Sequence, residues 1–230
     1  MSQSGYFITF EGIEGAGKST LAQFLHESLQ KDGWPAKITR EPGGTPVGES
    51  VRAILANPDS REITPLTEVL LLSASRSQLV EQFIRPQLGE GNIVICDRFF
   101  DSTMAYQGYG HQVHMREIRE LTDMCTWGVK PDLTILIDIE PALGLGRVRT
   151  RSAETLTRMD RFENMDFGFH ERVRDGFLEI AQDEPQRFRV FDGHMDLDTL
   201  KHKIYQLVHR EVTRIFPHPG KLNFDRSMLD

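Results

Sequence analysis

The chain has 230 residues, of which 39% are hydrophobic and 27% charged, an ordinary balance for a globular protein that buries a sizeable core. Its net charge of −7 disfavours a general binder of nucleic acid or anionic membranes, and no apolar run approaches the roughly 20 residues of a bilayer span. The N-terminus lacks a secretory pattern, and neither Cys96 nor Cys125 indicates a disulfide framework. We therefore expect a cytoplasmic protein with no nucleic-acid and no membrane partner.

The first predicted element in chain order is an apolar-aromatic strand over 6–11, and a glycine-rich loop follows it directly. The loop has the pattern G-x-x-x-x-G-K-[ST] and comprises Gly12, Ile13, Glu14, Gly15, Ala16, Gly17, Lys18, Ser19 and Thr20. Between a strand and a helix, such a loop directs consecutive backbone N–H groups at an anion. We expect it to bind ATP, with Lys18 reaching the β and γ phosphates and Ser19 serving as a ligand of Mg²⁺.

Strand-like and helix-like segments alternate along the rest of the chain, which is typical of repeated βαβ units. Further strands are predicted over 36–40, 92–97, 132–139 and 187–192. Helices are predicted over 18–31, 47–56, 65–84, 114–126, 141–150, 165–183 and 197–215. The continuous apolar runs in 93–96 and 133–137 indicate strands covered on both faces, so the predicted fold class is α/β with a mainly parallel five-stranded sheet. We expect one domain over 1–216 and a flexible tail over 217–230.

Ligands of open α/β sheets gather at the carboxyl ends of the strands, so the residues that follow each strand are the candidates for a site. Arg40 follows the second strand and Arg98 the third, and a planar guanidinium can hold phosphate through two hydrogen bonds. Asp97 ends an apolar strand as a Mg²⁺-binding aspartate does in many ATPases, and Asp138 is a competing candidate. The segment 147–161 carries five arginines against two carboxylates, which favours a cationic lid that closes over phosphates.

Several motifs in a fixed order make the chain similar to the thymidylate kinase family, whose members phosphorylate dTMP with ATP. They are the loop 10–20, Thr39-Arg40-Glu41-Pro42-Gly43-Gly44-Thr45, Asp97-Arg98, Ala105-Tyr106-Gln107-Gly108 and Pro131-Asp132-Leu133. The resemblance extends from about Phe7 to Phe216. It implies a nucleoside monophosphate kinase fold of the P-loop type, ATP with Mg²⁺, and a homodimer, for which the apolar helix over 65–84 is a candidate interface.

The resemblance also implies roles for individual residues. Lys18, Asp97 and Arg98 fall on catalytic positions, and Ser19 and Asp97 on metal-binding positions. Glu14 is expected near the 3′-hydroxyl of the acceptor, and Arg40, Arg76 and Arg98 at its phosphate. Ser102, Thr103 and Gln107 are expected near the thymine edge, and Tyr106 where a ribose 2′-hydroxyl would lie.

Two positions vary within the family. Gly15 stands where one branch has an arginine, so we expect the catalytic arginine to come from the lid, with Arg151 and Arg158 as candidates. Arg147 and Arg161 are expected to pair instead with Glu140, Asp160 or Glu163. Leu72 occupies the position of a phenylalanine that stacks on thymine, for which Phe99 or Phe100 would compensate.

Two other functions stay open on these patterns. One is a kinase for another nucleoside or nucleoside monophosphate, because Leu72 weakens the prediction of the base. The other is a P-loop ATPase that acts as a switch. Dependence on an acceptor distinguishes them, since a switch needs none.

Overall fold

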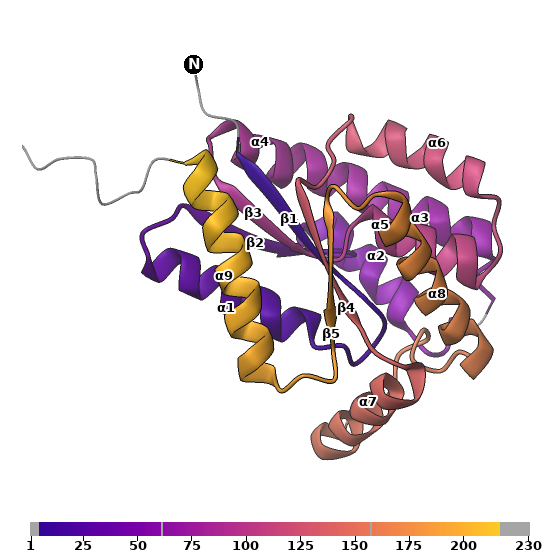
Figure 1. Cartoon of the computed structure of the whole chain (residues 1–230). Helices are drawn as coiled ribbons and strands as arrows, with labels where there is room; N and C mark the ends of the chain where they lie inside the picture. The colour runs from indigo at the N-terminus through magenta and orange to yellow at the C-terminus, as the bar shows by residue number, and fades with distance from the viewer. Residues whose placement is uncertain (1–4, 61, 157, 217–230) are drawn as a thin grey trace, which may run out of the picture.

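Five parallel strands form a single sheet in the order β2-β3-β1-β4-β5, as Figure 1 shows. This computed structural model describes residues 5–60, 62–156 and 158–216, so the predicted tail lies outside the described residues. The strands are β1 (Tyr6–Glu11), β2 (Ala36–Arg40), β3 (Ile93–Asp97), β4 (Leu133–Asp138) and β5 (Phe188–Asp192). All five predicted strands are confirmed to within one residue at each end.

Helices cover both faces of the sheet. They are α1 (Lys18–Lys31), α2 (Pro46–Ala56), α3 (Pro65–Leu79), η1 (Val80–Ile84), α4 (Arg85–Gly89), α5 (Phe100–Thr103), η2 (Met104–Gly110), α6 (Met115–Thr126), α7 (Pro141–Thr155), α8 (Phe167–Asp183) and α9 (Leu197–Ile215). The helices α1 and α9 lie side by side on one face, and α7 projects from the lower edge of the molecule in Figure 1. No helix in the described ranges is long and apolar enough to cross a membrane.

The alternation of side chains along β1 divides the core between the two faces of the sheet. Ile8 and Phe10 belong to the cluster that includes α1 and α9, whereas Phe7 packs on the opposite face with Leu79 and Val94. All of these side chains are fully buried. Burial on both faces explains why the sequence of β1 is continuously apolar rather than alternating.

The helical segment over 100–110 was not predicted, and α7 was expected to end at residue 150 but continues to Thr155. The first segment contains Gly108 and Gly110, which weaken any helical pattern, and part of it has the wide π-helical turn that is frequent at functional sites. Gly110 approaches Phe169 of α8 so closely that a Cβ atom would lie 2.6 Å from its ring. Tertiary packing therefore stabilises this helix where local propensity does not.

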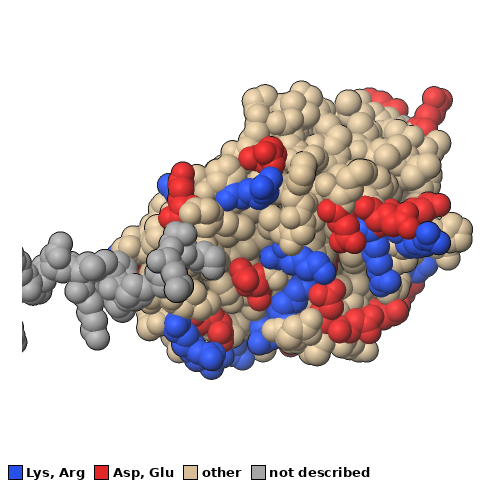
Figure 2. Space-filling model, turned by 90° about the horizontal axis from the view of Figure 1, so that it is seen from above, with Lys and Arg blue, Asp and Glu red and all other residues tan. Residues whose placement is uncertain are grey.

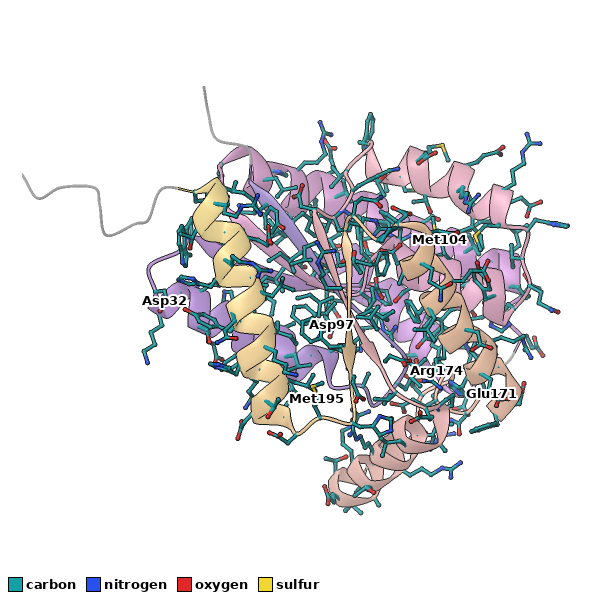
Figure 3. All side chains as sticks on the ribbon, in the orientation of Figure 1. Asp32, Asp97, Met104, Glu171, Arg174 and Met195 are labelled. Carbon is teal, nitrogen blue, oxygen red and sulfur yellow. The ribbon has the colours of Figure 1, made fainter. Side chains whose placement is uncertain are left out.

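The strand order brings β1 between β3 and β4, with Phe10 in register with both Asp97 and Ile135. Strands β3 and β2 lie on one side of β1, and β4 and β5 on the other. The connections on the two sides diverge at this point, so a crevice opens at the carboxyl ends of the strands. The glycine-rich loop and the residues after β3 are brought together at this crevice. Figure 3 labels Asp97, which lies at the carboxyl end of β3.

Candidate active site

A cavity of about 680 Å³ occupies the crevice. Its walls come from the glycine-rich loop, the ends of β2 and β3, and residues of α2, α3, η2 and α7. Glu14, Gly15, Gly17, Lys18, Ser19, Thr20, Arg40, Leu72, Arg76, Asp97, Arg98, Ser102, Thr103, Tyr106, Gln107 and Arg151 all line it. The structure thus brings most of the predicted site residues to one place.

The glycine-rich loop has the backbone shape that its glycines permit. Gly12, Gly15 and Gly17 have φ angles of 137°, 72° and 90°, values that side chains other than glycine rarely adopt. The Lys18 side chain is buried and donates from Nζ to the carbonyl oxygen of Ile13 at 2.8 Å. The lysine is therefore held within the loop, with its ammonium group available to phosphate oxygens.

Burial lowers the pKa of Lys18 to about 8, with Arg98 contributing in the same direction and Asp97, Glu14 and Glu11 opposing. A bound polyphosphate favours the ammonium form, so ATP binding is expected to take up a proton near pH 8.5. Affinity for ATP should be full well below the Lys18 pKa of about 8 and should fall as the pH rises through and above that value. Calorimetry in buffers of different ionisation enthalpy measures this uptake.

Burial together with Asp101 also raises the pKa of Glu11 to about 8, so a second group titrates in the same range. Two variants therefore identify the group that takes up the proton when ATP binds. Lys18→Met should abolish this proton uptake, whereas Lys31→Met, at the exposed end of α1, should retain it. Proton uptake that persists in Lys18→Met would assign the titration to another group.

The helix α7 contacts the glycine-rich loop directly. A Cβ atom at Gly15 would lie 2.1 Å from the carbonyl oxygen of Gly144, so no side chain fits there without moving the backbone. Arg147 donates to the carbonyl oxygens of Gly15, at 3.3 Å, and Gly193, at 3.2 Å. Arg147 thus joins the loop to α7 and to the turn after β5, instead of forming one of the carboxylate pairs expected from the sequence.

The two candidate metal-binding aspartates have different surroundings. Ser19 donates a hydrogen bond from its hydroxyl to Asp97, whose other oxygen, Oδ1, is buried and has no hydrogen-bond partner among the described residues. Asp138 instead receives hydrogen bonds of 2.7 and 2.9 Å from Arg174 on α8, labelled in Figure 3. Asp97 therefore keeps an oxygen for a cation, whereas Asp138 is neutralised by an arginine.

Ser19 and Asp97 offer the hard oxygen donors that Mg²⁺ prefers. In the described part of the chain, no group of three or more His, Cys, Asp or Glu side chains could hold a metal ion. This sparse set fits Mg²⁺, which commonly takes one or two protein ligands and completes its shell with water and substrate phosphates.

Arg98 lies at the centre of a hydrogen-bonded cluster. Its Nη1 donates to the carbonyl oxygen of Gly12 and to Ser102 Oγ at 3.0 Å, and its Nη2 to Glu14 at 3.3 Å and Tyr106 at 2.9 Å. These four partners fix the plane of the guanidinium at the mouth of the glycine-rich loop. Burial lowers the pKa of Arg98, but the interactions with Tyr106, Glu14, Glu11 and Asp97 outweigh this effect and raise it above its usual value.

The backbone at Arg98 has φ of 69°, an unusual conformation for a residue with a side chain. Glu11 stabilises it, because its carboxylate accepts from the backbone N–H of Phe99 at 2.7 Å and from the Ser102 hydroxyl at 2.5 Å. Such local strain clusters at functional sites, where the surrounding structure maintains it. Here it turns the Arg98 side chain toward the glycine-rich loop.

Glu14 remains ionised although it is nearly buried. Burial raises its pKa, but His170, Arg98, Lys18 and Tyr106 together lower it to about 2. The Tyr106 hydroxyl donates to Glu14 at 2.5 Å, and His170 Nδ1 lies 3.4 Å from the same carboxylate. A negative charge within a phosphate-binding loop is thereby balanced by its neighbours.

Apolar side chains also contribute to the cavity wall. Leu72 packs in a cluster with Val51 and Leu55, and the Phe162 ring packs against this cluster and lies edge-on to Tyr106 at 5.9 Å between centroids. Phe99 also lines the cavity. An aromatic surface is therefore present beside Leu72, supplied by Phe162, which the sequence analysis did not single out.

Arg76 of α3 also lines the cavity. It is 1% exposed and donates to Glu41 and to Thr103 Oγ1, each at 2.8 Å, while its Nη1 has no partner among the described residues. Its hydrogen bond to Thr103 and its place one turn after Leu72 on α3 set its surroundings. The family resemblance instead implies a place for Arg76 at the acceptor phosphate.

The remaining arginines differ in their position relative to the cavity and in their ion-pair partners. Arg40 and Arg151 line the cavity and pair with Glu49 at 3.0 Å and Glu163 at 2.9 Å. Arg158 is exposed, pairs with Asp59 at 3.1 Å and lines a separate hollow. Arg161 is buried and pairs with Glu68 of α3. Of the two lid candidates, the structure brings only Arg151 to the cavity.

A glycine-rich loop with a lysine within it, an aspartate at the end of the neighbouring strand and a cavity beside them are the parts of a P-loop phosphotransferase. The profile of the family described as thymidylate kinase matches residues 10–204 of this chain. The chain is 48% identical over 208 residues to the thymidylate kinase of Deinococcus radiodurans, covering 90% of this chain and 98% of that protein. It therefore belongs to the thymidylate kinase family.

Two further comparisons find thymidylate kinases that match over a similar share of the chain. A thymidylate kinase from Geobacter sulfurreducens is 43% identical over 211 residues, covering 91% of this chain and 99% of that protein. The crystal structure of thymidylate kinase from Ehrlichia chaffeensis superposes with a TM-score of 0.71 at 34% identity, covering 90% of this chain and 99% of that one. The family and the P-loop kinase fold predicted from the motifs are confirmed.

Proposed function

We propose that this chain transfers the γ-phosphoryl group of ATP to dTMP, giving ADP and dTDP for the synthesis of dTTP. The observation that carries the proposal is one cavity whose wall has two parts, a phosphate-binding loop and a set of arginine and apolar side chains beside it. A hydrolytic switch needs only the first of these parts. The second has the chemistry of a nucleoside monophosphate: cations for its phosphate and apolar and hydrogen-bonding groups for its base.

On the donor side, residues 12–20 bind the ATP phosphates, and Lys18 neutralises charge on the β and γ groups. Ser19 and Asp97 would hold Mg²⁺, which supplies further charge neutralisation when bound. On the acceptor side, Arg98 and Arg40 bind the dTMP phosphate and Glu14 accepts a hydrogen bond from the sugar. Tyr106 excludes a 2′-hydroxyl, and Ser102, Thr103 and Gln107 bind toward the base edge.

We place Arg76 with the base rather than with the phosphate, because it lies against Thr103 and Leu72. Its buried Nη1 has a donor to offer a base carbonyl. Leu72, Phe99 and Phe162 supply the apolar walls for the ring. A leucine in place of the usual phenylalanine is therefore compatible with binding of thymine.

The reaction needs no strong general base on the protein. The second pKa of a phosphate monoester lies near 6, so the acceptor is largely a dianion at neutral pH and is its own nucleophile. The obstacle is the repulsion between two polyanions. Lys18 and the arginines offset it while they align the attacking and leaving oxygens.

The lid over residues 147–161 supplies the last cation. Arg151 is already at the cavity and needs only to exchange Glu163 for a phosphate oxygen. Arg158 would first have to leave Asp59 and cross to the cavity. Arg151 is therefore the better candidate for stabilising the transferred group, with Arg158 contributing on lid closure.

The test is formation of ADP from Mg·ATP with dTMP, dUMP, UMP, CMP, GMP and thymidine as separate acceptors. Strong turnover that prefers dTMP supports the proposal. Preference for another acceptor would keep the kinase activity and overturn the substrate. ADP formation that requires no acceptor would favour an ATPase switch.

We further propose a cytoplasmic homodimer, joined through α3. Leu66 and Leu70 on this helix are each 49% exposed, and burial of such side chains favours association. Both cysteines are free and buried, which suits a reducing compartment. Figure 2 shows acidic and basic side chains interspersed on the face it presents, without a continuous basic surface there.

Leu70→Glu is expected to convert the dimer to a monomer of 26.3 kDa, because a charge would be buried in the interface. Light scattering after size exclusion measures the mass. Leu197→Glu places the same change on an exposed leucine of α9, on the opposite face of the sheet, and should leave the mass of the dimer unchanged. A wild-type chain that elutes as a monomer would exclude the interface.

A further inference from the structure

Glu68 is a fully buried carboxylate on α3, outside the residues assigned above to catalysis or binding. Its two oxygens have different partners: Oε1 accepts from the side-chain amide of Gln107, and Oε2 from the guanidinium of Arg161. His111 Nε2 lies 3.5 Å from Oε1. Glu68 therefore connects η2, which carries Gln107, with the end of the lid, which carries Arg161.

Arg161 gives this buried carboxylate the charged partner that burial requires. Arg161 is itself held by a hydrogen bond of 3.1 Å to the carbonyl oxygen of Leu55 at the end of α2. A carboxylate paired in this way offers only acceptor oxygens to its other neighbours. Gln107 must therefore present its NH₂ group to Glu68, and the reverse orientation of the amide would set two acceptors against each other.

This orientation leaves the carbonyl oxygen of the Gln107 amide for a ligand. Gln107 lines the cavity, and its Oε1 is buried without a hydrogen-bond partner among the described residues. An unsatisfied buried acceptor is costly, so a donor from a bound base would be favoured there. Thymine has an N–H at ring position 3, whereas cytosine has an unprotonated nitrogen at that position.

We infer that Glu68 is a positioning residue that fixes Gln107 as a hydrogen-bond acceptor toward the base and so selects pyrimidines with an N–H at position 3. The inference rests on the proposed placement of the dTMP base beside Gln107. Glu68 acts through Gln107 and does not itself contact the substrate. Its buried pair with Arg161 is what makes the selection possible, since it leaves the amide of Gln107 a single orientation.

Glu68→Gln tests the inference, because an amide at position 68 can face Gln107 with either its oxygen or its NH₂. Loss of one buried hydrogen bond predicts a rise of about tenfold in the KM for dTMP. The preference for dTMP over 5-methyl-dCMP, measured as a ratio of kcat/KM, should fall by about the same factor. The KM for ATP should not change, and Glu171→Gln at an exposed site on α8, labelled in Figure 3, is the matched control.

The exchanged pair Glu68→Gln with Gln107→Glu supplies the decisive comparison. The new amide at position 68 then accepts from Arg161 and donates to the new carboxylate at position 107, which again offers only an acceptor to the base. The exchanged pair should regain most of the preference for dTMP over 5-methyl-dCMP. Because all its polar groups have partners, it also serves if the single variant does not fold, and loss of the preference in a folded exchanged pair would overturn the inference.

Gln107→Leu separates failure of the inference from failure of the proposed function. If this variant leaves the KM for dTMP unchanged, the base does not lie beside Gln107 and the proposed placement is wrong. If Gln107→Leu raises that KM but Glu68→Gln changes neither the KM nor the preference, the placement holds and the role of Glu68 is refuted. Thermal unfolding of each variant establishes that it is folded.

Discussion

Replacing Lys18 by methionine should lower kcat for phosphoryl transfer by about a thousandfold, the range found when a charge-stabilising group is removed from a transition state. Lys18 is the cation within the glycine-rich loop, buried and held 2.8 Å from the carbonyl oxygen of Ile13. Methionine has a similar length and fills the same space, so it removes the charge with little change in packing. Steady-state kinetics with saturating dTMP measures the effect.

A structural explanation of the same loss can be excluded by two further measurements. The Lys18→Met protein should unfold cooperatively and should still bind dTMP, since Lys18 contributes to the donor side of the site. Lys31→Met, at the exposed end of the same helix, should retain wild-type kcat. A Lys18→Met enzyme within threefold of wild type would contradict the assignment of the donor site.

Arg98→Lys is expected to reduce kcat/KM for dTMP by about a thousandfold, with a much smaller effect on the KM for ATP. Lysine keeps one positive charge but cannot reach Gly12, Glu14, Ser102 and Tyr106 at once, as the planar guanidinium does. The acceptor phosphate would then lose both an orienting pair of hydrogen bonds and a fixed charge. Kinetics at varied dTMP and at varied ATP separates the two effects.

The same substitution weakens a partly buried ion pair with Glu14, so the free energy of unfolding should fall by about 3 kcal/mol at neutral pH. Arg85→Lys, in an exposed pair with Glu81 at 2.7 Å, is the matched control and should change neither quantity appreciably. An Arg98→Lys enzyme whose loss is confined to ATP affinity would move Arg98 from the acceptor to the donor side.

The parts of the fold that the sequence predicts best are those whose signals are local. Strand β1 and the glycine-rich loop are adjacent in the chain, and the apolar runs of β3 and β4 need only burial on both faces to be interpreted. The helix over 100–110 gives no such signal. Gly110 allows close packing against the Phe169 ring of α8, and only the folded chain shows that contact.

The residues of the candidate site likewise divide into those that a local motif identifies and those that only contacts distant in sequence identify. Lys18 and Ser19 could be assigned from spacing alone, but the choice between Asp97 and Asp138 depends on Arg174, which is distant in sequence. Likewise, Arg151 and Arg158 look equivalent in the sequence, and only their partners, Glu163 and Asp59, separate them.

Glu68 and Phe162 were not identified as site residues, because each acquires its position through contacts between α3, η2 and the end of the lid. A buried glutamate in an apolar helix carries no motif of its own. Its significance becomes visible only when its partners are known.

Transfer of a phosphoryl group between two nucleotides bound in one cavity can be followed by product analysis. The purified chain would be incubated with dTMP and Mg·ATP labelled in the γ-phosphoryl group, and the nucleotides separated by chromatography. We expect label in dTDP, with one ADP formed for each dTDP. Label released as inorganic phosphate, with dTMP unchanged, would show that the chain hydrolyses ATP and does not transfer its phosphoryl group.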